Sequence, residues 1–355
     1  MASFISAISF VFLALSFSTT VESTLVPAIF VFGDSLADVG NNNYLDLPIG
    51  FKSDFPHNGI DFPGRIPTGR FSNGFNGIDY IAMELGFVKS PPPYLSIRNA
   101  VQMQKGVNYA SAGSGILQTT GNGTLTMATQ VKYFADTKRA LAKIFGGSTV
   151  NDILAKSLYC FVTVNNDIFA YYSVTGAVNS TANAKFISNL IDEYLGYLTM
   201  VYKLGGRKFA ITGSAFLGCV PYIRSRNPTG DCIDELNQLS VQFNAAALPR
   251  IQQLSNQLPG FKYSYMSLYN LSTIISAEPD SFGFKELKSA CCGTGKFNGE
   301  TQCLPNATYC SSRTEYFYWD IAHPTQSLYN LTTQFQLYGS NSVVTPINLK
   351  QLIQS

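Results

Sequence analysis

Ser35 and His323 are the side chains of this 355-residue chain whose types and surroundings suit nucleophilic catalysis. Ser35 lies in Gly33-Asp34-Ser35-Leu36, directly after a run of apolar residues. A serine in this place is exposed at the carboxyl end of a strand, where open parallel sheets carry their active sites. We expect a helix to follow, and a serine before a helix is also typical of an N-cap. From these residues alone, both roles stay open.

The chain has only two histidines, so a serine mechanism has little choice of base. His57 lies in a turn-forming segment, with no carboxylate spaced to orient it. His323 follows Asp320 by three residues. This spacing lets the carboxylate bind Nδ1 and leaves Nε2 free to act as a base. The alternative is a partly buried His323 that caps a helix beginning at Pro324.

Two further strand ends offer groups that could stabilise an oxyanion. The small residues around Gly113 allow a backbone N–H to approach a substrate oxygen. Asn166 follows another apolar run, and its side-chain amide could donate to the same oxygen. Taken separately, these segments are an ordinary glycine-rich turn and the start of a helix. Their interest is that both lie at the sheet edge predicted for Ser35.

The elements that position these residues follow an alternating pattern of short apolar runs and longer amphipathic segments. This pattern is typical of a parallel sheet covered by helices on both faces. No repeat or linker interrupts it, so we predict a single α/β domain over residues 24–355. A Gly- and Pro-rich connection over residues 48–94 is expected to shape a cleft. The predicted strands are Ala28–Phe32, Gly106–Ala110, Leu158–Val164, Lys208–Thr212 and Phe261–Met266, and the predicted helices include Gly77–Leu85, Ala182–Leu204 and Cys232–Leu258.

The composition indicates a packed globular protein, with 46% hydrophobic and 13% charged residues. A net charge of +2, without a basic run, argues against nucleic acid or an anionic membrane as a partner. The apolar run from Phe4 to Phe17 is too short for a membrane span and suits the core of a signal peptide. We predict a signal peptide over residues 1–23 and no stable membrane insertion after its removal. A retained anchor is the alternative.

Glycosylation sequons and clustered cysteines agree with secretion. Six of the seven cysteines lie between residues 219 and 310, which predicts local disulfides in an oxidising compartment. Zinc binding is the alternative, although no histidine lies near the cluster. Cys160 is left over and is expected to be a buried free thiol. The expected disulfides join Cys219 with Cys232 and the adjacent Cys291 and Cys292 with Cys303 and Cys310, and the sequons are at Asn122, Asn179, Asn270, Asn306 and Asn330.

These segments, in this order, resemble the plant GDSL esterase/lipase family of the SGNH hydrolases. The similar motifs run along nearly all of the chain after residue 23 and include FVFGDSLADVGNNNYL, DFPGRIPTGRFSNG, SPPPYLS, GVNYASAGSGIL, CCGTGKFNGETQC and YWDIAHPT. The resemblance implies a flavodoxin-like three-layer α/β/α fold around a central five-stranded parallel sheet. It also implies a secreted, N-glycosylated serine hydrolase of carboxylic esters.

The resemblance assigns a role to each candidate residue by its position. Ser35 matches the nucleophile, Asp320 and His323 match the acid and base of the triad, and the N–H groups of Ser35 and Gly113 with the Asn166 amide match the oxyanion hole. It implies no metal and no organic cofactor. We expect a monomer that takes a small-molecule or lipid ester and acts outside the cell, in the apoplast or cell wall, or in another secretory compartment.

One residue departs from the family pattern G-x-N-D, because Val164 stands where the family has glycine. Valine is stiff and bulky, so it could misplace Asn166 and weaken the oxyanion hole. It could instead only narrow the acyl or alcohol pocket. The sequence leaves both outcomes open.

Two other functions compete with ester hydrolysis. An acyltransferase would use the same residues with an acceptor other than water. A non-catalytic secreted binding glycoprotein would keep the fold, and Val164 is the only residue that motivates this alternative.

Overall fold

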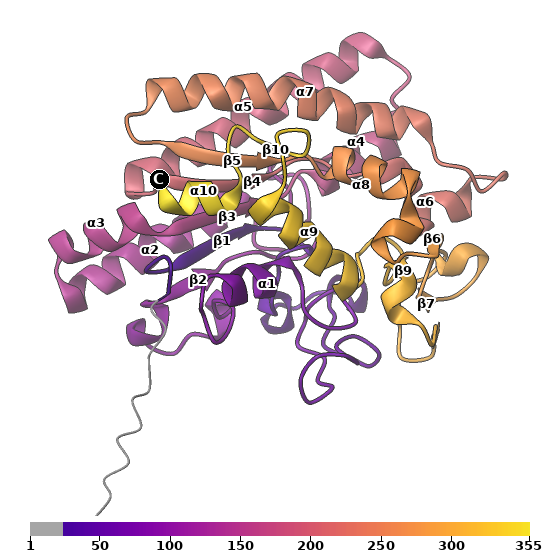
Figure 1. Ribbon diagram of the computed structural model, residues 1–355, viewed down its shortest axis with the longest axis horizontal. Coiled ribbons are helices and arrows are strands. Elements are labelled where there is room, and N and C mark those ends of the chain that lie inside the picture. Colours follow the sequence, from indigo (N-terminus) through magenta and orange to yellow (C-terminus); the bar gives the residue numbers. More distant parts are fainter. Residues whose placement is uncertain (1–23) are drawn as a thin grey trace, which may run out of the picture.

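A six-stranded sheet forms the centre of the molecule (Figure 1). The computed structural model describes residues 24–355, so the predicted signal peptide, residues 1–23, lies outside the described residues. The strand order is β10-β5-β4-β3-β1-β2, with β10 antiparallel to β5 and all other neighbours parallel. The five predicted parallel strands are therefore confirmed. The strands are β1 (Ile29–Gly33), β2 (Gly106–Asn108), β3 (Leu158–Val162), β4 (Lys208–Thr212), β5 (Lys262–Met266) and β10 (Val344–Thr345).

The alternation of side chains along β1 explains why helices cover both faces of the sheet. Phe30 and Phe32 are fully buried in one apolar cluster with residues of α2, α5 and α7. Ile29 and Val31 point to the opposite face and are buried in a second cluster with residues of α1 and α10. In Figure 1, α5 and α7 accordingly run together along one side of the sheet. The result is the three-layer α/β/α arrangement that the resemblance implies.

At least one helix lies between each parallel strand and the next one along the chain, as a connection between parallel strands requires. Among residues 24–355, no helix combines the length and the hydropathy that a membrane span needs. The helices are α1 (Gly77–Glu84), α2 (Met127–Phe145), α3 (Gly147–Lys156), α4 (Asn165–Thr175), α5 (Ser180–Leu204), α6 (Pro221–Arg226), α7 (Asp234–Gln257), α8 (Leu268–Ala277), α9 (Gln326–Tyr338) and α10 (Leu349–Gln354).

Most predicted boundaries differ from the observed ones by one or two residues, and polar side chains explain two of the differences. The second predicted strand ends early because the Asn108 side chain accepts a hydrogen bond from the Ala110 N–H (2.9 Å) and turns the chain. The helix predicted to begin at Ala182 begins at Ser180, because Asn179 caps it. The sixth strand, β10, was missed because two residues carry no periodicity.

A smaller region beside the sheet holds four of the cysteines, Cys291, Cys292, Cys303 and Cys310. It contains a parallel pair, β6 (Glu286–Ala290) with β9 (Tyr316–Tyr318), and an antiparallel pair, β7 (Cys292–Gly293) with β8 (Thr308–Tyr309). All six clustered cysteines are in disulfides, so the disulfide prediction is confirmed and the zinc alternative is wrong. The bonds are Cys219–Cys232, Cys291–Cys310 and Cys292–Cys303, and Cys160 is a buried free thiol as predicted.

Candidate active site

Ser35, His323 and Asp320 form one continuous set of hydrogen bonds. His323 Nε2 lies 2.8 Å from Ser35 Oγ, and His323 Nδ1 lies 2.7 and 2.8 Å from the two carboxylate oxygens of Asp320. With Nδ1–H donating to the carboxylate, Nε2 is the ring nitrogen that accepts the Ser35 hydroxyl proton. This is the arrangement that nucleophilic catalysis by a serine requires.

Ser35 lies in a turn at the carboxyl end of β1, and no α-helix begins there. The expectation that Ser35 caps a helix is wrong, because the next element is the short 3-10 helix Asn41–Tyr44. Asp34 makes the local bonds of the turn: its Oδ1 accepts from the Leu36 N–H (3.0 Å), and its carbonyl accepts from the Ala37 N–H (3.1 Å). The Ser35 hydroxyl is therefore left for His323.

Glycine is required immediately before this turn. A Cβ on Gly33 would lie 2.0 Å from the carbonyl oxygen of Val162 on the neighbouring strand β3. Only a residue without a side chain allows the end of β1 to pack this closely on β3. Gly33, the first residue of the GDSL motif, thus allows β1 to pack closely on β3, whereas Ser35, the third residue, contacts His323.

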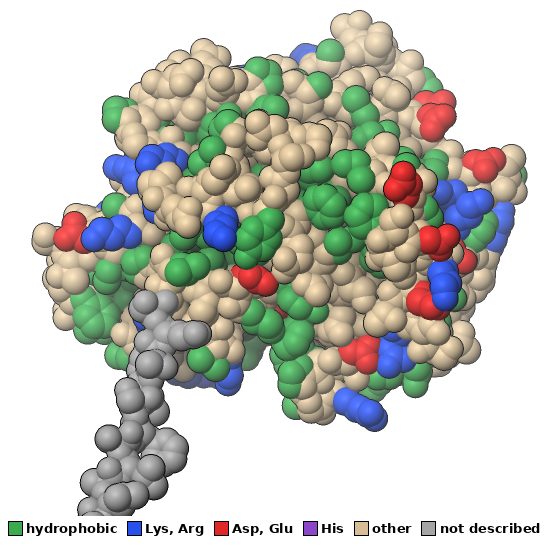
Figure 2. Space-filling view, viewed as in Figure 1, with side chains coloured by type: hydrophobic (Ala, Val, Ile, Leu, Met, Phe, Trp, Pro, Cys, Tyr) green, Lys and Arg blue, Asp and Glu red, His purple; other side chains and the backbone are tan. Residues whose placement is uncertain are grey.

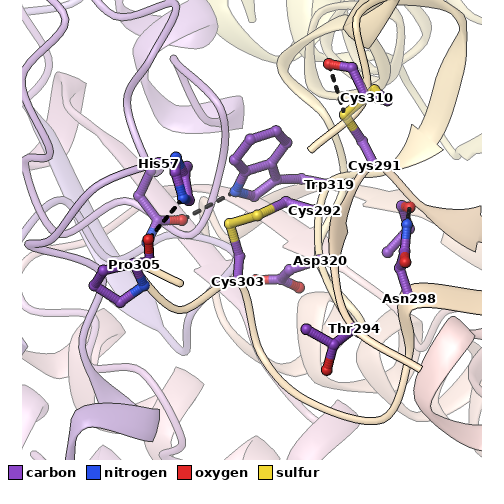
Figure 3. Close-up of a disulfide and its surroundings, with 12 residues drawn as sticks. His57, Cys291, Cys292, Thr294, Asn298, Cys303, Pro305, Cys310, Trp319 and Asp320 are labelled. Carbon is purple, nitrogen blue, oxygen red and sulfur yellow. Dashed lines mark hydrogen bonds between the residues drawn. A yellow bond between two sulfur atoms is a disulfide. The ribbon is translucent and has the colours of Figure 1, made fainter. Parts of the chain in front are cut away.

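Backbone hydrogen bonds fix the loop that carries Asp320 and His323. Asp320 Oδ1 accepts from the His323 N–H (2.9 Å), and the Trp319 N–H donates to the His323 carbonyl (2.8 Å). The Cys292 N–H donates to the Trp319 carbonyl (2.7 Å), and Trp319 Nε1 donates to Asn58 Oδ1 (2.9 Å). Figure 3 shows Trp319 and Asp320 beside the Cys292–Cys303 disulfide. The loop is therefore bound to a disulfide-stabilised region on one side and to the segment around Asn58 on the other.

Burial of Asp320 favours its neutral form, but its partners outweigh this effect. The positive charge that His323 acquires on protonation, its ring N–H and two backbone N–H groups hold the pKa of Asp320 below its ordinary value. Asp320 therefore stays a carboxylate that orients His323 and stabilises its protonated form.

The other histidine is engaged elsewhere. His57 Nε2 lies 3.1 Å from the carbonyl of Pro305 (Figure 3). The His57 ring also packs against Tyr309. His323 also does not cap a helix, since α9 begins at Gln326 and is capped by Thr325. The structure thus brings His323, and not His57, to Ser35.

The loops after β1, β2 and β3 meet beside Ser35. Ser114 Oγ and the Ser111 N–H both donate to the Gly33 carbonyl (2.9 and 3.0 Å), which places Gly113 next to the end of β1. Asn166 Nδ2 donates to the Ser114 carbonyl (2.9 Å). The three groups expected to bind an oxyanion therefore lie on three mutually bonded loops.

The backbone donors on two of these loops are free of protein acceptors. Within the described residues, neither the Ser35 N–H nor the Gly113 N–H donates a hydrogen bond to the protein. Gly113 has φ +84, and a Cβ there would lie 2.5 Å from the ring of Phe51, so its conformation and surroundings both demand glycine. Free backbone N–H groups in a fixed loop are the donors that stabilise a developing oxyanion.

A largely apolar cavity of about 100 Å³ opens beside these groups. Ser35, Asn166 and His323 line it, and Gly113 does not. The rest of the lining comes mainly from apolar side chains of residues 215–220, which follow β4, and of α8, β9 and α9. The reacting groups therefore face a space into which an apolar part of a substrate could extend.

Comparison with known proteins identifies the family. Residues 29–334 match the family described as GDSL-like Lipase/Acylhydrolase. Two GDSL esterase/lipases of Arabidopsis thaliana are 35% and 36% identical to this chain, covering 93% and 92% of it and 90% and 86% of their own lengths. A third, 34% identical, covers 98% of both chains. The chain belongs to the GDSL lipase/acylhydrolase family.

Val164 replaces the glycine of the family pattern but takes a glycine-like conformation. Its backbone has φ 99 and ψ −31, and its carbonyl accepts from the N–H groups of Asp167 and Ile168 at the start of α4. Its side chain is buried in the core and does not line the cavity. Asn166 does line the cavity. Val164 therefore does not narrow the pocket, and α4 starts as it would from a glycine.

Two buried polar residues without a predicted role, Gln130 and Asp167, hold together the loops after β1, β2 and β3. Gln130 accepts from the Gly33 N–H (2.8 Å), and its Nε2 donates to the Gly33 carbonyl (2.9 Å) and to Ser114 Oγ (3.2 Å). Asp167 accepts from the Ile116 N–H (2.8 Å) and from Thr120 Oγ1 (2.7 Å). In the sequence, Gln130 stands out only as a single amide among the apolar residues on the buried face of α2.

The asparagine-rich stretch after the GDSL motif also acts through hydrogen bonds. Asn41 Nδ2 donates to the carbonyls of Asn108 (2.9 Å) and Ala110 (2.8 Å), and Asn42 Nδ2 donates to the carbonyl of Ala112 (2.9 Å). These bonds tie the segment after β1 to the segment after β2. The motif therefore continues past Ser35 because its amides support the loop that carries Gly113.

Proposed function

We propose that this chain is a secreted serine esterase that hydrolyses carboxylic esters through an acyl-enzyme on Ser35. The observation that carries the proposal is the 2.8 Å contact between Ser35 Oγ and an imidazole already oriented by Asp320. Membership of a family whose curated relatives are named esterase/lipases supports the same reaction class.

In the proposed reaction, His323 takes the hydroxyl proton as Ser35 Oγ attacks the ester carbonyl. Asp320 stabilises the resulting imidazolium. The Ser35 and Gly113 N–H groups and the Asn166 amide stabilise the negative charge on the carbonyl oxygen. His323 then protonates the leaving alcohol, and water attacks the acyl-enzyme by the reverse sequence of proton transfers.

Ser35→Ala tests this assignment directly. We expect kcat for 4-nitrophenyl esters to fall by about 10⁵-fold or more, because the nucleophile is lost. A fluorophosphonate probe should label the wild type and not the variant. Ser173→Ala, which removes an exposed hydroxyl on α4, is the control and should keep both activity and labelling. Unchanged turnover in Ser35→Ala would refute the proposal.

The proposal also includes secretion, removal of the signal peptide, a monomeric state, the class of substrate and glycosylation. Three disulfides suit an oxidising compartment. We propose that the signal peptide over residues 1–23 is removed, that residues 24–355 act as one monomeric domain, and that the substrate is a small-molecule or lipid ester. The sequon asparagines proposed to carry glycans are all exposed: Asn122, Asn179, Asn270, Asn306 and Asn330.

A further inference from the structure

The cavity beside Ser35 has a lining that discriminates between classes of ester. Among the described residues that line it, Asp34 is the one acidic residue, and none is Lys, Arg or Glu. Leu271 and Ile275 follow one another on the same face of α8 and are 2% and 0% exposed, while Phe317 of β9 and Leu328 of α9 are each 5% exposed. Burying a hydrocarbon chain against this wall is favourable, because it removes apolar surface from water. The same wall offers few hydrogen-bonding partners to a sugar hydroxyl or to a charged group.

The surface around this region is apolar as well. In Figure 2, hydrophobic side chains gather around α8 and α9, with a few acidic and basic side chains near them.

The size of the cavity sets a limit on the chain that it can hold. Its volume is about 100 Å³. Apolar cavities of about 150 Å³ stay dry and bind benzene, so this smaller cavity suits a chain of about four to six carbons. Acetyl would leave most of the space unfilled, and a long acyl chain would not fit within it.

A second apolar cavity of about 60 Å³ lies next to the first. Four residues line both cavities and so form the wall between them. Two of these, Leu36 and Pro324, adjoin Ser35 and His323 in sequence, whereas Leu268 and Thr332 lie on α8 and α9. Leu268 is thus a wall residue that can be shortened without changing a neighbour of the reacting groups.

We infer that the cavity beside Ser35 is the acyl pocket, and that the preferred substrates are esters of acyl chains of about four to six carbons, with Leu268 setting the upper limit of chain length. This inference rests on the proposed function, because it assigns the acyl half of the substrate to a site beside the proposed nucleophile.

The first test is the dependence of kcat/KM on acyl length in 4-nitrophenyl esters from acetyl to dodecanoyl. We expect a maximum at butanoyl to hexanoyl for the wild type. Leu268→Ala should join the two cavities and raise the octanoyl-to-hexanoyl ratio of kcat/KM by about tenfold, the discrimination that one buried methylene can supply. Leu248→Ala on α7 is the matched control, because Leu248 is a half-buried core leucine that lines neither cavity.

Filling the pocket should have the opposite effect. Leu271→Trp should lower the ratio of kcat/KM for the hexanoyl ester to that for the acetyl ester by about tenfold or more. Should Leu271→Trp fail to fold, Ser272→Phe places a ring in the same cavity from a less buried position. A wild-type maximum at acetyl, or identical length profiles for Leu268→Ala and Leu248→Ala, would overturn the inference.

Binding without turnover separates this inference from the proposed function. Hexanamide, a neutral analogue of the acyl half, should bind to Ser35→Ala protein in calorimetry and should bind Leu271→Trp at least about tenfold more weakly. If hexanamide binds in this way but no ester is hydrolysed, the pocket stands and the proposed function fails. If esters are hydrolysed but hexanamide does not bind Ser35→Ala, the acyl pocket is wrong and the proposed function stands.

Discussion

Val164 shows how one residue can keep a glycine conformation without being glycine. Its φ of 99 lies in the region that disfavours a β-branched side chain, and such strain costs about 1–3 kcal/mol. The surrounding structure holds it there: the side chain is 1% exposed in the core, and the carbonyl begins the hydrogen bonding of α4. The cost of this conformation therefore falls on stability, and Asn166 lines the cavity beside Ser35.

Asn166→Ala and Val164→Gly should differ sharply in activity. Removing the amide donor should lower kcat by about 10²–10³-fold with little change in KM, because the bond to the oxyanion is stronger in the transition state. Val164→Gly should change kcat by less than about threefold, because the backbone already has the conformation that glycine would take. Steady-state kinetics on a butanoyl ester measures both. A large gain in kcat for Val164→Gly would mean that valine does impair the oxyanion hole.

At the scale of elements, β9 and the loop after it depend on the cysteine-rich region. The N–H groups of Cys291 and Cys292 donate to the carbonyls of Tyr318 and Trp319, directly before Asp320. Disulfides join Cys291 to Cys310 and Cys292 to Cys303. The acid and base of the proposed triad are thus placed by a covalently closed region outside the central sheet.

Replacing Cys292 and Cys303 together by serine should therefore reduce activity as well as stability. A disulfide closing a loop of this size contributes about 2–3 kcal/mol to the free energy of unfolding. We also expect kcat to fall by about tenfold at a temperature where the variant is folded, because small misplacements of catalytic groups are costly. Cys160→Ala is the control, since it removes a buried thiol that forms no bridge. If kcat is unchanged in the folded double variant, the disulfide does not position the loop.

At the scale of the whole molecule, buried carboxyl groups make stability depend on pH. Burial raises the pKa of Asp34 to about 7, against an ordinary value of 3.8, and the Leu36 N–H only partly offsets it. Burial also raises the pKa of Asp38 to about 6. Between the ordinary and the raised pKa, the folded chain holds protons that the unfolded chain has released, so a rise in pH favours unfolding.

The free energy of unfolding should therefore fall as the pH rises from about 4 to about 7, and Asp34→Asn should flatten that slope. Asparagine keeps an acceptor for the Leu36 N–H but cannot ionise. Denaturant unfolding at several pH values measures the effect, with Asp152→Asn, an exposed aspartate on α3, as the control. An equal slope in wild type and Asp34→Asn would contradict the prediction.

The parts of the fold and of the candidate site that could be predicted are those that depend on residues close together in the sequence. The parallel strands show as apolar runs, and Asp320 with His323 shows as a spacing of three residues. Gln130 could not be assigned because its partner Gly33 is 97 residues away. The same holds for Trp319, which bonds to Asn58 across 261 residues, and for the conformation of Val164, which the packed core imposes against its own preference.

The contact between His323 and Ser35 spans 288 residues, and this separation has a consequence for the order of synthesis. The proposed nucleophile leaves the ribosome early, whereas the proposed base follows 288 residues later, after β1 to β5 have been made. A nascent chain that ends before residue 320 has a serine with no base to activate it. On the proposed mechanism, ester cleavage therefore cannot begin until the chain has been made as far as His323 and this residue has packed against Ser35.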